Sequence, residues 1–281
     1  MTLAVHKALR GSGRGDRRSR RRGASPEFAQ HRAYSTGDDL RHVDWAVYAR
    51  LGELFLKEHS AEQDLNLYLL LDTSASMGLH GKLPQACRLA ATFAYIGLAS
   101  GDRVRLQCFA DGAVRPALGP LRGRRGLRPL LEFLSALEAS GATGFEDCVR
   151  RFCARSQSPG LVLCISDLLA PDSVDDALGR LAASTHEALV LHVMAEAELD
   201  PELDPELGGE VELRCVEADE RVSMTLDGVA LERYRQRVRG FLAKVEARCR
   251  KGRLRYLRCL EHEDVAELVF RGARERGFFM P

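Results

Sequence analysis

Apolar residues in this chain form short blocks that alternate with longer segments of helical periodicity. The sharpest block is Leu65–Met77, in which an apolar run ends at Asp72 and is followed by Ser74 and Ser76. An apolar run bounded in this way predicts a buried strand, typical of a parallel sheet. A segment with helical spacing follows from about Lys82 to Ala99. The carboxylate and hydroxyls are therefore expected at the carboxyl end of a central strand, where open α/β sheets bind ligands.

The same alternation continues along the rest of the chain and predicts the fold class. Further strands are expected at Arg103–Phe109, Leu161–Ile165, Ala188–Met194 and Leu254–Leu260, and helices at Leu127–Leu137, Phe145–Arg155, Ser173–Ser184, Leu231–Arg250 and Asp264–Arg276. Ala113–Pro116 is expected to form a short antiparallel edge strand, and residues 197–210 a loop. This order predicts an α/β fold, a doubly wound and mostly parallel sheet with helices on both faces.

Composition divides the chain into three parts. Residues 1–24 are rich in Arg and Gly and poor in large apolar groups, which predicts a flexible basic tail. Residues 25–62 mix charged and aromatic residues and are expected to pack on the sheet as an N-terminal extension, pinned by ion pairs of Arg41 or Arg50 with Asp38, Asp39 or Asp44. A contact surface near a metal is the alternative. Residues 63–281 form the α/β domain, with a small hairpin insertion near 208–228.

Three separate pieces of sequence place short oxygen-bearing side chains at strand ends or in loops. They are Asp72-x-Ser74-x-Ser76, Thr143 in a glycine-rich loop, and Asp167 after the strand at Leu161–Ile165. Right-handed crossovers bring the loops that follow parallel strands to one edge of the sheet, so these pieces can converge. Oxygen ligands of this kind suit a hard cation such as magnesium. The alternative is that the hydroxyls cap helices and the aspartates accept backbone hydrogen bonds.

These motifs resemble two known patterns. Asp72-Thr73-Ser74-Ala75-Ser76, with Thr143 and Asp167, looks like the metal-ion-dependent adhesion site of von Willebrand factor A domains. The block from Arg32 to Trp45, with Ala49 and Arg50, resembles bacterial proteins of the domain-of-unknown-function family 58, which carry it just upstream of an A-like domain. The resemblance covers roughly residues 25 to 200 and implies a von Willebrand factor A-like fold.

The resemblance also implies a role for each residue of the site. Ser74 and Ser76 would bind Mg2+, or another divalent cation such as Mn2+ or Ca2+, directly. Thr143 would bind directly or through water, while Asp72 and Asp167 would act through waters and balance charge. An acidic residue of a protein partner would complete the coordination, and the implied partner is a MoxR-type AAA+ ATPase. The chain would then be a non-enzymatic adaptor or co-chaperone in protein assembly or maturation.

Charge, apolar stretches and cysteine content bear on the expected partners and cellular location of the protein. The formal net charge is only +1, so no global field favours nucleic acid, although five arginines crowd into residues 17–22. No apolar stretch approaches the ~20 residues of a membrane span, and no signal core opens the sequence. The eight cysteines include no Cys-x-x-Cys pair and are expected to be reduced core residues of a cytoplasmic protein.

Two other functions remain open from the sequence. A hydrated cation beside carboxylates could serve a metal-dependent hydrolase, although no general base or second metal is evident. An RNA-binding A domain could instead use the arginine-rich tail, with a steep salt dependence of binding. The sequence lacks a phosphate-binding loop of the Gly-x-x-x-x-Gly-Lys type and a Gly-x-Ser-x-Gly elbow, so ATP binding and serine hydrolysis are not expected.

Overall fold

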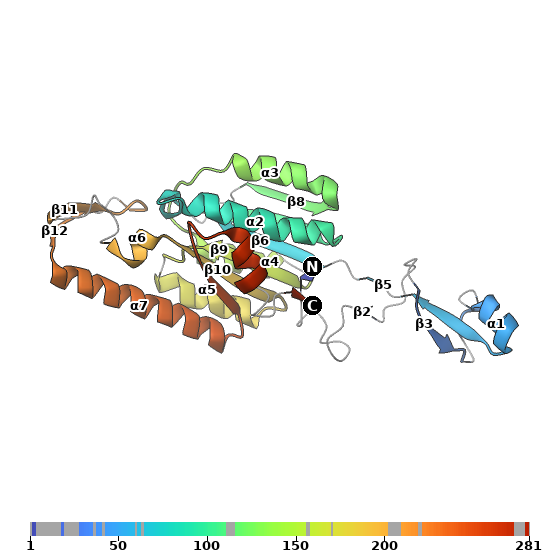
Figure 1. Cartoon of the computed structure of the whole chain (residues 1–281). Coiled ribbons are helices and arrows are strands. Elements are labelled where there is room, and N and C mark those ends of the chain that lie inside the picture. Colours follow the sequence, from blue (N-terminus) through green and yellow to red (C-terminus); the bar gives the residue numbers. More distant parts are fainter. Residues whose placement is uncertain are drawn as a thin grey trace. The chain divides into compact units, whose positions relative to one another are not determined.

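A computed structural model describes most of the chain. The described residues are 2–3, 18–19, 28–35, 38–40, 43–59, 61–62, 65–110, 116–155, 158–169, 171–201, 209–218, 221–272 and 279–280. The chain forms two compact units, one of Met1–Ala8 with Leu65–Pro281 and one of Leu9–Asp64. The larger unit contains the candidate site (Figure 1).

A six-stranded sheet forms the centre of the larger unit, with strand order β13-β10-β9-β6-β7-β8. The five neighbours from β13 to β7 are parallel, and β8 alone pairs antiparallel, with β7. The strands are β6 (Asn66–Asp72), β7 (Arg103–Phe109), β8 (Ala117–Arg122), β9 (Gly160–Ser166), β10 (Glu187–Met194) and β13 (Arg255–Leu260). The predicted α/β fold with a mostly parallel sheet is therefore confirmed.

Alternate side chains of each central strand belong to two different cores. Leu67, Leu69 and Leu71 of β6 pack into one hydrophobic cluster, and Tyr68 and Leu70 into the other. The strands β9 and β10 divide their side chains in the same way. A strand buried on both faces requires apolar residues at every position, which explains why these strands read as continuous apolar runs.

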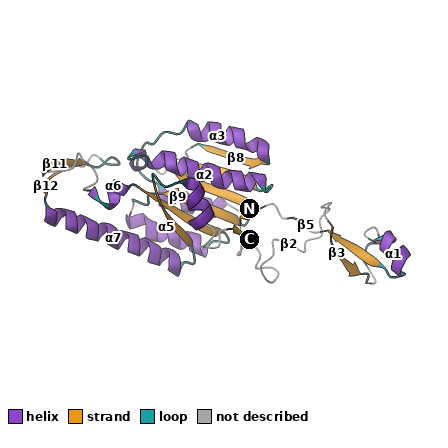
Figure 2. Ribbon diagram, viewed as in Figure 1, coloured by secondary structure: helices purple, strands orange, loops and turns teal. Residues whose placement is uncertain are grey.

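Helices cover both faces of the sheet (Figure 2). The first cluster includes α2 (Lys82–Ala99) and α3 (Leu127–Ser135), and the second includes α4 (Phe145–Arg155), α5 (Pro171–Ala183) and α7 (Gly228–Lys251). None of the helices in the described part of the chain is long and apolar enough to cross a membrane.

The order of the strands places a topological switch point between β6 and β9. The chain leaves β6 through α2 on one face of the sheet and reaches β7, whereas it leaves β9 through α5 on the other face and reaches β10. Neighbouring strands whose connections depart to opposite faces leave a crevice at their carboxyl ends. The residues that follow β6 and β9 therefore lie beside the position where such folds bind ligands.

The remaining elements are short. The described residues add α6 (Glu196–Leu199), the hairpin β11 (Gly209–Arg214) and β12 (Arg221–Leu226), α8 (Val265–Glu267) with a π-helical turn at Leu268–Gly272, and the terminal pair β1 (Thr2–Leu3) and β14 (Phe279–Met280). The smaller unit contains β2 (Arg18–Ser19), β3 (Phe28–Ala33), α1 (Trp45–Leu51), β4 (Phe55–His59) and β5 (Ala61–Glu62). Asp44 caps α1 by accepting hydrogen bonds from the N–H groups of Ala46 and Val47.

Several sequence-based boundaries differ from the structure, those of α3, α5 and α7 by one to three residues and those of three other elements more substantially. The described antiparallel edge strand is Ala117–Arg122, which begins after Pro116, because Leu118 and Leu121 can pack against the first core. Residues 196–199 form α6 within the expected loop, since the carboxylate of Glu198 accepts the N–H of Ala195 and closes the turn. In the last predicted helix, the residues Leu268–Gly272 form a π-helical turn. Residues 113–115 and 273–278, Arg41 and most of the arginine-rich tail lie outside the described residues.

Candidate functional site

Asp72 ends β6 beside the switch point, and its carboxylate is fully buried. Its Oδ1 accepts the N–H of Ser74 at 2.9 Å. Its Oδ2 accepts hydrogen bonds from the hydroxyls of Ser166, at 2.6 Å, and of Thr143, at 3.3 Å. The backbone of the loop after β6 and two side chains, one from the end of β9 and one from the loop that precedes α4, therefore meet at one carboxylate.

The loops that carry Ser74 and Thr143 are tied together through their backbones. The N–H of Ala75 donates to the carbonyl of Gly141 at 2.7 Å, and the N–H of Ser140 donates to the carbonyl of Thr73 at 2.9 Å. Ser76 lies in a 3-10 turn, Ala75–Gly78, which brings its Oγ to 3.1 Å from the Oγ of Ser74. The two hydroxyls are buried side by side next to Asp72.

Burial raises the pKa of Asp72 to about 7, and the negative charge of Asp167 adds to the shift. The hydrogen bonds from Ser166 and Ser74 act in the opposite direction, because they stabilise the carboxylate. Because burial disfavours the ionised form of this carboxylate, a positive charge bound beside it would be stabilising.

Asp167 follows β9, and its carboxylate forms its hydrogen bonds away from the hydroxyls. Oδ2 accepts the ammonium of Lys82 at 2.7 Å, and Oδ1 accepts the N–H of Leu169 at 3.2 Å. Lys82 also pairs with Glu198 of α6, and the Lys82 side chain has no exposed surface. Burial alone would lower the pKa of Lys82, but the charges of Asp167 and Glu198 outweigh it and raise that pKa.

His192 of β10 supports the backbone at Asp167. Its Nε2 lies 2.8 Å from the carbonyl oxygen of Asp167, and its Nδ1 lies 2.9 Å from the hydroxyl of Tyr256. Burial lowers the pKa of His192 to about 4. The imidazole is therefore neutral at neutral pH and acts as a hydrogen-bonding brace.

Glu217, in the connection between β11 and β12, contacts the site from outside the sheet. Its Oε2 accepts the backbone N–H of Thr143 at 2.9 Å. Its Oε1 is buried and has no hydrogen-bond partner among the described residues. A buried carboxylate oxygen without a partner is costly unless a cation or an ordered water satisfies it.

The donor set fits a hard divalent cation better than a softer metal ion such as Zn2+ or Cu2+. The oxygens around Asp72 come mainly from the hydroxyls of Ser74, Ser76 and Thr143. Within the described ranges, no group of three or more His, Cys, Asp or Glu side chains lies close enough together to bind a metal ion by itself. Hydroxyl and carboxylate oxygens suit Mg2+, Mn2+ or Ca2+, and waters would have to complete the coordination.

The structure joins four of the five predicted residues by direct hydrogen bonds and holds the fifth through Lys82. Asp72 forms hydrogen bonds with Ser74 and Thr143, and Ser74 lies within hydrogen-bond distance of Ser76. Asp167 acts on Asp72 only through its negative charge, which raises the pKa of Asp72. Four further residues, Lys82, Ser166, Glu198 and Glu217, were not assigned from the sequence. Ser166 precedes Asp167 in a polar pair at the strand end, which was a visible signal.

A family model described as "Protein of unknown function DUF58" matches residues 30–243. The chain belongs to this family. Similar proteins include uncharacterized proteins of Mycobacterium bovis and Mycobacterium tuberculosis, each 27% identical to this chain over 210 residues. The match covers 71% of this chain and 65% of each relative, so it leaves about a third of each relative's length unmatched.

A solved structure also resembles this DUF58 protein. The crystal structure of manganese-loaded TRAP protein of Plasmodium vivax matches with a TM-score of 0.33 and 16% sequence identity. The match covers 46% of this chain and 57% of that one.

Proposed function

We propose that this protein is a divalent-metal-dependent interaction module of the von Willebrand factor A type, without catalytic activity of its own. The observation that carries the proposal is the meeting of Ser74, Thr143 and Ser166 on the buried carboxylate of Asp72. A bound cation would offset the free-energy cost of burying that negatively charged carboxylate. It would offer a positive centre on which an acidic side chain of another protein can bind.

In this proposal each residue of the site has a distinct part. The hydroxyls of Ser74, Ser76 and Thr143 and the carboxylate of Asp72 would hold the ion. Asp167 would contribute negative charge from its place beside Lys82, because its oxygens are already engaged by that lysine and by Leu169. Glu217 would add a further carboxylate oxygen, which is buried and accepts no hydrogen bond from the described residues.

The partner class follows from the resemblance rather than from the geometry. We infer a MoxR-type AAA+ ATPase, with this chain acting as an adaptor or co-chaperone in protein assembly or maturation. An exposed acidic side chain of the ATPase would bind at the metal. Charge-assisted recognition in a partly desolvated site is stronger than a surface ion pair, which is worth only ~0–1 kcal/mol.

The metal part of the proposal is tested by isothermal titration of the EDTA-treated protein with MgCl2 and MnCl2. We expect saturable binding of one ion in the wild type, weakened at least about tenfold, or ~1.4 kcal/mol, in Asp72→Asn. Asparagine keeps the shape of the side chain and one acceptor oxygen for the N–H of Ser74, while its NH2 group can donate to the hydroxyl oxygens of Ser166 and Thr143. Asp147→Asn, an exposed carboxylate on α4, is the matched control. Absence of a binding signal at millimolar concentrations would refute the metal site.

The partner part has its own experiment. The tagged protein is incubated with the purified MoxR-type ATPase of the same source, with MgCl2 and ATP or with the chelator EDTA. Because EDTA also removes magnesium from ATP, Asp72→Asn in magnesium is compared as well. Recovery should fall with EDTA and with Asp72→Asn and remain with Asp147→Asn. Equal recovery in all samples would mean that recognition does not depend on the metal.

A further inference from the structure

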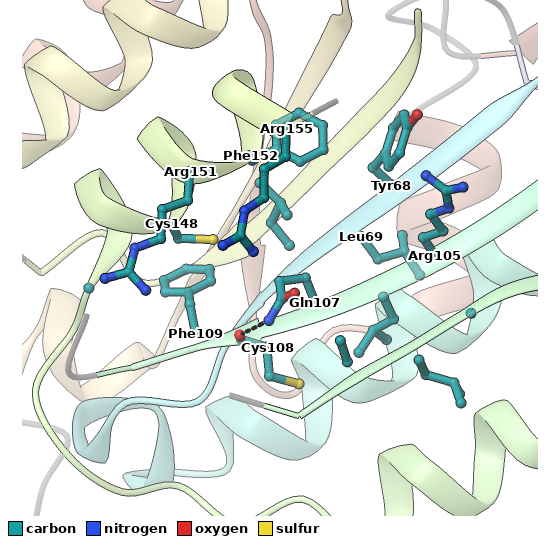
Figure 3. Close-up of a pocket in the computed structure, with 16 residues that line it drawn as sticks. Tyr68, Leu69, Arg105, Gln107, Cys108, Phe109, Cys148, Arg151, Phe152 and Arg155 are labelled. Carbon is teal, nitrogen blue, oxygen red and sulfur yellow. Dashed lines mark hydrogen bonds between the residues drawn. The ribbon is translucent and has the colours of Figure 1, made fainter. Parts of the chain in front are cut away.

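A pocket of about 280 Å3 opens on the side of the sheet that carries α4. Its walls come from the neighbouring strands β6, β7 and β8, from α4 and from Gly144 (Figure 3). Helix α2 packs against β6 and β7 from the opposite face of the sheet. The pocket therefore occupies sheet surface beside α4 and does not share side chains with the five predicted metal-binding residues.

Aromatic rings form the apolar part of the pocket. The rings of Tyr68 on β6 and Phe152 on α4 meet edge to face, with centroids 5.1 Å apart. Phe109 at the end of β7 adds a third ring to the lining. Flat apolar surfaces of this kind favour a flat apolar or aromatic body.

Three guanidinium groups line the same pocket, and none of the described residues that line it carries a carboxylate. Arg151 and Arg155 come from α4, whereas Arg105 comes from β7 and lies with its guanidinium carbon 5.9 Å from the centre of the Tyr68 ring (Figure 3). Arg151 lies 3.8 Å from Asp147. Neither Arg105 nor Arg155 forms an ion pair with a carboxylate in the described part of the chain. The pocket thus carries an excess of positive charge.

We propose that this pocket binds a small amphipathic anion, with a flat apolar body against Tyr68, Phe109 and Phe152 and an acidic group bound by Arg105 and Arg155 together. The size points to a small molecule, because 280 Å3 lies at the lower end of small-molecule sites, which span ~300–1,000 Å3. Guanidinium groups on opposite walls suit a carboxylate, sulfonate or phosphate, which they bind through charge-assisted hydrogen bonds. This binding site is independent of the proposed metal site.

The test compares two probes of nearly equal shape. One is 8-anilinonaphthalene-1-sulfonate, and the other is N-phenyl-1-naphthylamine, which has the same aromatic body without the sulfonate. Fluorescence titration should show that the wild type prefers the anionic probe by about tenfold or more, the scale of one charge-assisted hydrogen bond. Arg105→Gln and Arg155→Gln should each remove most of that preference while leaving the affinity for the neutral probe unchanged.

Two further variants separate this site from non-specific dye binding. Arg150→Gln alters an exposed arginine of the same helix, one that pairs with Asp147 and does not line the pocket, and should bind both probes as the wild type does. Ala117→Trp places a large ring at the rim and should abolish binding of both probes. Circular dichroism melting confirms that each variant is folded. Equal affinity for the two probes in the wild type, or no loss in the Arg105→Gln, Arg155→Gln double variant, would overturn the proposal.

Discussion

The ammonium of Lys82 lies 2.7 Å from a carboxylate oxygen of Asp167, and neither side chain has exposed surface. Lys82 opens α2 and Asp167 follows β9, so the pair joins elements that are 85 positions apart in the chain. The lysine also reaches Glu198 on α6. The buried ammonium of Lys82 therefore links the start of α2, the end of β9 and α6 at the carboxyl edge of the sheet, and it compensates the negative charge of Asp167.

Removal of that ammonium is expected to destabilise the fold. Lys82→Met keeps most of the side-chain volume but leaves Asp167 buried without its cation, a change that costs ~3–5 kcal/mol. Denaturant unfolding followed by circular dichroism measures the difference. Lys244→Met is the control, because Lys244 is 61% exposed in its pair with Asp175 and should cost less than ~1 kcal/mol. Equal stability of the two variants would show that the buried pair does not contribute to stability.

Replacement of Glu217 tests how far the hairpin takes part in the candidate site. Glu217→Gln keeps an oxygen for the N–H of Thr143 but removes the negative charge of a carboxylate whose second oxygen has no partner in the described part of the chain. The protein should therefore keep or gain stability without metal, and its affinity for Mg2+ should fall by a few-fold because less negative charge faces the ion. Titration calorimetry with the protein in EDTA-free buffer measures both wild type and variant.

The control for this prediction is Glu212→Gln, an exposed glutamate of β11 in the same hairpin that pairs with Arg221. It should leave both stability and metal affinity unchanged. A Glu217→Gln variant that unfolds like a core mutant would contradict the idea that its buried oxygen is uncompensated.

Two helices were predictable to the residue, whereas α3, α5 and α7 differ from the expected bounds by one to three residues. Lys82–Ala99 and Phe145–Arg155 begin and end as expected, because apolar positions recur at helical spacing up to each boundary. The edge strand at Ala117–Arg122 was missed by several residues. A strand paired on one side has few apolar positions to mark it, and its place depends on which residues reach the partner strand.

Only the site residues that belong to recognisable sequence motifs could be predicted. Asp72, Ser74 and Ser76 are close in the chain, and Thr143 reaches Asp72 because two loops share backbone hydrogen bonds. Lys82, Glu198 and Glu217 could not be assigned, since their roles depend on how a helix start, a four-residue helix and a hairpin connection meet in space. A buried lysine in the first turn of an amphipathic helix gives no sign of its partners.

Gly160 is expected to tolerate no side chain. A Cβ at this first residue of β9 would lie 2.2 Å from the carbonyl oxygen of Asn66 in the neighbouring strand. Gly160→Ala must therefore push β9 away from β6, at the strands that carry both aspartates of the site, and should lower the free energy of unfolding by several kcal/mol. Gly240→Ala in α7 is the control, because a Cβ there meets nothing within 4 Å and should raise stability by ~0.5–1 kcal/mol.

Thiol labelling should distinguish one cysteine from the buried ones. Cys215 is exposed, whereas burial raises the pKa of Cys249 to about 12 and that of Cys87 to about 11. Because the thiolate is the reactive form, only about one Cys87 side chain in a thousand is ionised at pH 8, and fewer at Cys249. Iodoacetamide at pH 7.5 should therefore modify Cys215 first, as peptide mass spectrometry can show.

The pH dependence of this labelling has a definite sign. Raising the pH increases the thiolate fraction, so the slow modification of Cys87 should accelerate about tenfold for each pH unit from 8 to 10 without reaching a plateau, as expected below its raised pKa. Cys249 should be slower still, because its side chain has no exposed surface and requires local unfolding for access. Cys215→Ser should remove the fast phase alone. Labelling of Cys249 as fast as that of Cys215 in the folded protein would contradict the packing of α7 against the sheet.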